Sequence, residues 1–179
     1  MTAADSGTPL EQGAMRMFAH TPEISKGLAA FAGSLKQNRS LPDRLVELVR
    51  LRVAFHNQCR SCMAIRYKDG QEDGITEDLV CSLEKPMEAE NLSDAEKAAI
   101  HYGELFATNH LAINDEVYDN LRKYFSESEI VELSITVAFF VGFGRLAASY
   151  HMVEELPESF QANEEETLTP WGNESIIVR

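Results

Sequence analysis

The sequence has few basic residues for its length. Only 16 of its 179 residues are lysine or arginine, whereas 29 are aspartate or glutamate, and the formal net charge is -13. A nucleic-acid-binding protein needs a basic face that neutralises phosphates, and an anionic membrane surface attracts positive charge for the same reason. We therefore expect no nucleic acid and no membrane among the partners of this chain.

Long apolar runs are also missing. The longest run, Ile135 to Gly144, falls far short of the roughly 20 residues that a membrane-spanning helix needs, and Arg145 follows it directly. Residues 1–7 do not show the pattern of a secretory signal, which is a basic stretch followed by an apolar core. A cytoplasmic location is the resulting expectation.

Cysteine is scarce as well. Three cysteines are too few for a framework of disulfides, and two of them, Cys59 and Cys62, form a C-x-x-C pair. In a cytoplasmic chain this spacing favours redox or metal chemistry. The third, Cys81, lies in the apolar pattern Leu79 to Leu83, and we expect it to be an ordinary core residue.

Alternation of apolar and polar residues, the pattern of a half-buried strand, is absent before the last few residues, and helical periodicity dominates. We predict an all-α, single-domain bundle of about seven to eight helices over residues 1–152. An acidic, irregular tail over residues 153–179 is expected to be loose or docked on a neighbouring subunit. The predicted helices cover residues 10–18, 22–35, 42–55, 59–67, 76–83, 93–106, 115–125 and 126–148.

Two of these helices carry specific signals. Ser93 with Glu96, and Ser126 with Glu129, have the spacing of a capping box at a helix N-terminus. The helix after Ser126 is apolar on most sides, which predicts a central position in the bundle. The helix over residues 42–55 combines an apolar stripe with polar residues that include Glu47 and Arg50, which predicts one solvent-facing side.

The C-x-x-C pair carries the clearest chemical signal. Three-residue spacing at the start of a helix places both sulfurs on one face, close enough to form a disulfide. Exposed N–H groups at a helix start lower the pKa of a thiol, and Arg60 and Arg66 act in the same direction. The helix start favours Cys59 as the attacking sulfur, whereas nearness to Arg66 favours Cys62, so the order of attack stays open.

Two longer segments resemble a known family. The stretch Leu41 to Ala54, followed by His56 to Cys62, resembles the signature segment of the alkylhydroperoxidase D-like branch of the carboxymuconolactone decarboxylase family. A second stretch, from Phe125 through Leu146, is similar to the C-terminal core helix of that family. The resemblance covers roughly Met15 to Met152.

The resemblance implies an all-helical protein that assembles as a trimer or hexamer. We expect no cofactor and no metal site. Its dithiol would reduce peroxides or pass electrons to the disulfide of a partner. Glu47 falls at the position of the family's proton-relay glutamate, but Arg66 stands where that branch has a histidine. Arginine stabilises negative charge but does not shuttle protons, and His56 is the nearest substitute.

We therefore hypothesise a thiol-dependent oxidoreductase that acts on a small hydroperoxide or a protein disulfide, with an unidentified electron donor. The candidate catalytic residues are Cys59, Cys62, Glu47, Arg66 and His56. One alternative is a non-catalytic or redox-sensing oligomer, and another is a decarboxylase-like lactone enzyme. Three simpler interpretations also stay open. The two thiols could be idle, they could bind zinc with His56, His101 or Cys81, and Glu47 could be a surface acid paired with Arg50 or Arg44.

Overall fold

A computed structural model describes residues 9–151, 153, 156–161, 167–171 and 177–179, and it describes no side chains before residue 13. Two parts of the predictions lie outside the described residues: Met152 at the end of the predicted domain, and residues 154–155, 162–166 and 172–176 of the predicted acidic tail.

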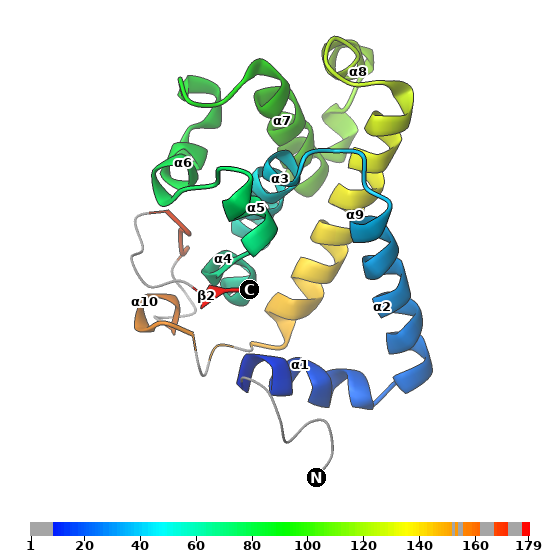
Figure 1. Ribbon diagram of the computed structural model, residues 1–179, viewed down its shortest axis with the longest axis vertical. Helices are drawn as coiled ribbons and strands as arrows, with labels where there is room; N and C mark the ends of the chain where they lie inside the picture. Colours follow the sequence, from blue (N-terminus) through cyan, green and yellow to red (C-terminus); the bar gives the residue numbers. More distant parts are fainter. Residues whose placement is uncertain (1–8, 152, 154–155, 162–166, 172–176) are drawn as a thin grey trace.

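The described residues form ten α-helices, and the all-α prediction is confirmed (Figure 1). The α-helices are α1 (Pro9–Ala19), α2 (Pro22–Gln37), α3 (Asp43–His56), α4 (Arg60–Ala64), α5 (Lys68–Glu72), α6 (Glu77–Cys81), α7 (Asp94–Thr108), α8 (Asp115–Leu121), α9 (Glu127–Ser149) and α10 (Glu158–Gln161). Short 3₁₀-helices are η2 (Ser82–Glu84), η3 (Pro86–Glu88) and η4 (His110–Ala112), and the strands are β1 (Ile65–Arg66) and β2 (Ile177–Val178).

The observed elements depart from the prediction most clearly just after the cysteines. A single helix was expected over residues 59–67, but α4 ends at Ala64 because Ile65 adopts an extended backbone. Ile65 and Arg66 then pair in parallel with Ile177 and Val178, at the other end of the chain. Helix α5 and helix α10 were not predicted, and they raise the count from about eight to ten in the described part.

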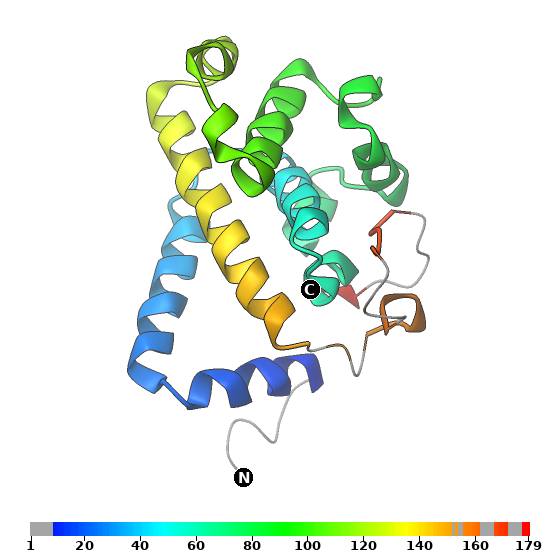
Figure 2. The ribbon, with the colours of Figure 1, turned by 180° about the vertical axis from the view of Figure 1, so that it is seen from behind.

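Helix α3 forms the centre of the bundle, and it packs chiefly against α7 and α9 (Figure 2). Leu48, Val49 and Leu51 are almost completely buried. The polar side of this helix meets solvent only in part, since Glu47 and Arg50 are buried as well. Short helices α4 and α5 cover that side, and the two charged residues pair with each other.

Helix α9 begins with the predicted capping box, as does α7, and both are confirmed. Its position differs from the prediction. Its buried residues face α3 and α7, but Val131, Ile135 and Leu146 are exposed. The helix therefore lies at the edge of the core rather than inside it. By length and composition alone, α9 could also cross a membrane, but the core helix of a bundle passes the same test.

The described parts of the C-terminal segment pack against the chain itself, in the region of α4. Gln58 binds the backbone of Leu168 through both atoms of its side-chain amide, at 2.9 and 3.1 Å. The ring of Trp171 packs against Phe55 at 4.8 Å between centroids. β2 completes the docking by pairing with β1, beside α4 in Figure 1.

Arg66 connects the docked segment to the bundle. Its side chain is fully buried, and its guanidinium donates to both carboxylate oxygens of Glu77 and to the carbonyls of Met63, Ile65 and Pro170. These bonds use all five N–H donors of an arginine. The backbone of Arg66 also accepts a hydrogen bond from the N–H of Arg179. Arg66 is therefore a structural residue that joins α4, α6 and the C-terminal segment.

The contact between α3 and α9 depends on Gly144. The side chain of Asn57, at the end of α3, donates to the carbonyl of Phe140 and accepts from Arg145 on α9. A Cβ atom at Gly144 would overlap the amide nitrogen of Asn57. Because that amide is held by hydrogen bonds on both sides, it cannot move aside without losing them.

We predict that Gly144→Ala lowers the free energy of unfolding by about 1–3 kcal/mol, the usual cost of overpacking. Gly142→Ala is the matched control, because a Cβ there meets no atom within 4 Å. That variant should be neutral or more stable by up to ~1 kcal/mol, since alanine favours a helix over glycine. Urea unfolding measures both variants, and equal stability of the two would contradict the proposed contact.

Candidate functional site

Cys59 and Cys62 form a disulfide, with 5.2 Å between their Cα atoms. Cys59 is the N-cap residue of α4, and its sulfur accepts a hydrogen bond from the backbone N–H of Cys62 at 3.3 Å. The three-residue spacing therefore brings the two sulfurs together at a helix start. The structure describes the oxidised state of the pair, and reduction would release two thiols.

The two cysteines differ in access. Cys59 is completely buried, with Ser61 as a hydrogen-bonding neighbour of its sulfur at 3.6 Å. Cys62 is only partly buried, and it lines a cavity of about 350 Å³. A small molecule in this cavity would therefore meet Cys62 and not Cys59.

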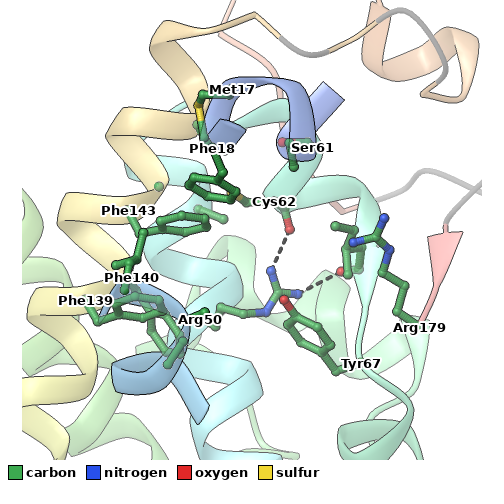
Figure 3. Close-up of a pocket in the computed structure, with 18 of the residues that line it drawn as sticks. Met17, Phe18, Arg50, Ser61, Cys62, Tyr67, Phe139, Phe140, Phe143 and Arg179 are labelled. Atoms are coloured by element: carbon green, nitrogen blue, oxygen red, sulfur yellow. Dashed lines mark hydrogen bonds between the residues drawn. The ribbon is translucent and has the colours of Figure 1, made fainter. Parts of the chain in front are cut away.

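The cavity lies between α1 and α2 on one side and α3, α4 and α9 on the other, and it is mainly apolar (Figure 3). Phe139 and Phe143 stack at 5.3 Å between centroids, and Phe18 from α1 stacks on Phe143 at 6.3 Å. The polar residues that line it are Ser25, Arg50, Ser61, Cys62, Tyr67 and Arg179. We call this space the apolar cavity.

Arg50 lies at the centre of the site. Its guanidinium forms two hydrogen bonds of 2.7 Å with the carboxylate of Glu47, and it donates to the carbonyls of Cys62 and Ile65 at the same distance. Burial disfavours the charged form of Arg50, but the Glu47 carboxylate outweighs it and holds the pKa of the guanidinium above its ordinary value. The charged guanidinium therefore holds the backbone of Cys62, within α4, and of Ile65, just after it.

Glu47 is buried, and its carboxylate is bound by Arg50 and by the backbone N–H of Tyr67 at 3.3 Å. The interpretation of Glu47 as a surface acid is therefore wrong, although its pairing with Arg50 was one of the alternatives. Gly70 permits this burial, because a Cβ there would stand 3.0 Å from the Cγ of Glu47. Glu47 faces a second cavity of about 210 Å³, which also contains Lys36 and Asp69. We call this space the polar cavity.

Arg66 does not serve the site in the way that we predicted. All five of its N–H donors are bonded to Glu77 and to backbone carbonyls, so it has none left for a thiolate. The positive charge beside Cys62 comes from Arg50 instead.

His56 lies in a separate cluster on the α7 side of α3. Its Nε2 atom is 3.2 Å from Glu104, which also pairs with Arg52. Burial alone would raise the pKa of the Glu104 carboxyl, but the hydrogen bonds with His56 and Arg52 hold it below its ordinary value. His56 is thus hydrogen-bonded to the ion pair of Arg52 and Glu104, and the apolar cavity is lined by other residues.

Two further expectations concern cysteine and metal. Cys81 is exposed, so its assignment to the core is wrong, because the buried side of α6 carries Leu79 and Val80 instead. Within the described residues, no group of three or more histidine, cysteine, aspartate or glutamate side chains is placed to hold a metal ion.

Sequence reasoning missed Arg50 and Tyr67 as site residues. Tyr67 lies beneath Arg50, with 4.8 Å between the guanidinium carbon and the ring centroid, and it lines the apolar cavity. A signal for Arg50 was present, since it follows Glu47 by three residues on one helix. For Tyr67, which follows β1 directly, the sequence offers no comparable signal.

Comparison with known sequences supports the resemblance. The sequence profile of the carboxymuconolactone decarboxylase family matches residues 22–105, a region that contains Glu47, Arg50, Cys59 and Cys62. An uncharacterized protein of Mycobacterium tuberculosis, Rv2313c, is 30% identical over 121 residues, which are 66% of this chain and 42% of that protein. The uncharacterized protein YdfG of Bacillus subtilis is 28% identical over 92 residues, which are 51% of this chain and 63% of that protein. The chain thus spans less than two thirds of either relative.

Two solved structures share the fold. One is a protein of unknown function from Agrobacterium tumefaciens, suggested to be the antioxidant defence protein AhpD, with a TM-score of 0.67 and 21% identity. The match covers 79% of this chain and 95% of that one. The other is an uncharacterized peroxidase-related protein from Ralstonia eutropha with an alkylhydroperoxidase AhpD core, a TM-score of 0.65 and 17% identity, which covers 83% of this chain and 78% of that one. Residues 22–105, which include the disulfide, thus match the carboxymuconolactone decarboxylase family, and the chain shares its fold with these two structures.

Proposed function

We propose that the protein is a thiol-dependent reductase of small organic hydroperoxides, with Cys62 as the attacking residue. One observation carries the proposal: the more accessible cysteine of a disulfide lines a mainly apolar cavity. A volume of about 350 Å³ suits a small organic molecule rather than a loop of a partner protein. The cavity therefore favours hydroperoxide reduction over exchange with a protein disulfide.

The reaction begins from the reduced dithiol. The thiolate of Cys62 attacks the terminal oxygen of the hydroperoxide, the O–O bond breaks, and the departing alkoxide takes a proton to become an alcohol. Cys62 is then a sulfenic acid. The thiol of Cys59 attacks its sulfur, water leaves, and the disulfide forms. Two thiols and one hydroperoxide thus give a disulfide, an alcohol and water, and an external dithiol must restore the reduced pair.

Arg50 supports this chemistry electrostatically. Its hydrogen bond to the carbonyl of Cys62 keeps a permanent positive charge next to the residue whose sulfur must ionise. Such a charge lowers the pKa of a thiol and raises the fraction of reactive thiolate. Glu47 keeps this guanidinium in place and supplies the compensating charge in the polar cavity.

We predict that Cys62→Ser reduces turnover of cumene hydroperoxide, with dithiothreitol as donor, to the uncatalysed background. Cys59→Ser should still consume one equivalent and accumulate a sulfenic acid on Cys62, because the resolving thiol is absent. Dimedone labelling followed by mass spectrometry locates that adduct. Cys81→Ser is the control and should keep full activity, since Cys81 is exposed and outside the disulfide. Unchanged turnover in Cys62→Ser would contradict the proposal and favour a non-catalytic role.

A second prediction concerns substrate size. Ala29 lines the apolar cavity from the exposed helix α2, so a larger residue there should fill the cavity without disturbing the core. We expect Ala29→Phe to lower kcat/KM for cumene hydroperoxide by roughly 10-fold or more, a usual effect of a changed apolar pocket. Turnover of hydrogen peroxide should change little. Ala30→Phe, on the same helix but outside the cavity lining, is the matched control, and an equal loss for both peroxides would argue against substrate binding in this cavity.

We also propose that the protein forms a homo-oligomer. Val131 and Ile135 on α9, and Phe31 on α2, expose apolar surface on neighbouring helices, and Phe31 is in edge contact with Phe139 on α9. Exposed apolar clusters of this kind are typical of protein interfaces.

We predict that light scattering detects an assembly larger than one chain and that Val131→Glu shifts it toward the monomer, because the interface would bury an unpaired charge. Leu111→Glu is the control, since Leu111 is 85% exposed and lies away from this surface on η4. A monomeric wild-type protein would contradict the proposed assembly.

A further inference from the structure

The apolar cavity and the polar cavity share one wall. Ala32, Arg50, Tyr67, Phe139 and Phe140 line both. Two of these five residues, Arg50 and Tyr67, have polar side chains. The polar cavity holds the carboxylates of Glu47 and Asp69, whereas the apolar cavity holds Cys62. A proton that passes between the cavities along protein groups must therefore pass at Arg50 or Tyr67.

The proposed reaction needs a proton inside the apolar cavity. Cleavage of the O–O bond produces an alkoxide, which is a poor leaving group until it is protonated. Arg50 and Arg179 cannot supply this proton, because a guanidinium stays protonated at any working pH. Ser25 donates its hydroxyl hydrogen to the carbonyl of Phe18, and Ser61 is paired with the sulfur of Cys59. Among the polar groups that line this cavity, Tyr67 is the remaining neutral side chain with an acidic hydroxyl.

The surroundings of Tyr67 suit it to this task. Its ring lies under the guanidinium of Arg50 at 4.8 Å, and its backbone N–H donates to Glu47. Figure 3 shows its hydroxyl turned toward that guanidinium, in the part of the cavity below Cys62. A phenolate formed there would be stabilised by the adjacent positive charge.

We propose that Tyr67 is a catalytic proton donor, whose hydroxyl protonates the alkoxide that leaves when Cys62 takes the terminal oxygen of the hydroperoxide. The inference rests on the function proposed above. The alkoxide becomes an alcohol and Tyr67 becomes a phenolate. The phenolate then recovers a proton from the polar cavity, which balances the proton that Cys62 released on forming its thiolate. Tyr67 thus takes over a task that the resemblance assigned to a histidine at position 66.

The test compares two oxidants that differ in their need for a proton. Tert-butyl hydroperoxide releases an alkoxide, whereas peracetic acid releases acetate, which leaves without protonation. Fully reduced protein is mixed with each oxidant, and the rate of disulfide formation is followed in a single turnover. Tyr67→Phe keeps the aromatic ring beneath Arg50 and the backbone N–H, and it removes the hydroxyl alone. Tyr124→Phe is the matched control, because Tyr124 is 42% exposed, against 43% for Tyr67, and lies outside both cavities.

We expect Tyr67→Phe to slow the reaction with tert-butyl hydroperoxide by about 100-fold, the lower end of the range for general acid catalysis. The rate with peracetic acid and the rate of alkylation of Cys62 by iodoacetamide should stay within about twofold of wild type, because neither needs a donated proton. Equal losses with both oxidants would show a structural role and overturn the inference, as would an unchanged rate with tert-butyl hydroperoxide. If the reduced wild-type protein forms no disulfide with either oxidant, the proposed function itself fails.

Discussion

The buried ion pair of Arg50 and Glu47 is the interaction on which the site depends. It joins three parts of the chain, because Arg50 binds the carbonyls of Cys62 and Ile65, and Glu47 binds the backbone of Tyr67. A buried pair of this kind costs desolvation, and that cost is offset only when further hydrogen bonds satisfy both groups. Here the backbone at the end of α4 provides these bonds. The same contacts that allow the two charges to be buried therefore hold the disulfide turn in place.

The fold makes two chemically identical residues unequal. Cys59 caps α4 and is sealed in the interior, whereas Cys62, three residues later, lines the apolar cavity. Both features favour Cys62 as the attacking residue: it is accessible from the cavity, and the positively charged Arg50 is hydrogen-bonded to its backbone. This assignment replaces the earlier argument from Arg66, since the donors of Arg66 are all bonded elsewhere. An arginine close to a cysteine in sequence can thus be directed away from it in space.

The C-terminal segment makes the disulfide turn part of a larger unit. Gln58 binds Leu168 just before the first cysteine, and β2 pairs with β1 just after the second. The turn that carries both sulfurs is therefore held on both sides by residues that are distant in sequence. Gln58 and Leu168 are 110 positions apart, and Arg66 and Pro170 are 104 positions apart. Such long-range contacts limit the movement of the backbone when the sulfurs join or part.

Local patterns in the sequence determined the helical class, the two capping boxes and the position of the cysteine pair at a helix start. Each depends on contacts between residues within about four positions of one another, so a short stretch of sequence is enough to predict it. The tertiary structure decided the rest. The burial of Glu47 and Arg50, the task of Arg66 and the docking of the C-terminal segment depend on which segments meet in space. Helix periodicity shows which residues lie on the polar side of a helix. Only the packing of α4 and α5 over α3 shows whether those residues meet solvent or a partner. Likewise, the spacing in the sequence identified the two cysteines as a redox pair, but the fold determines which of the two a substrate can reach.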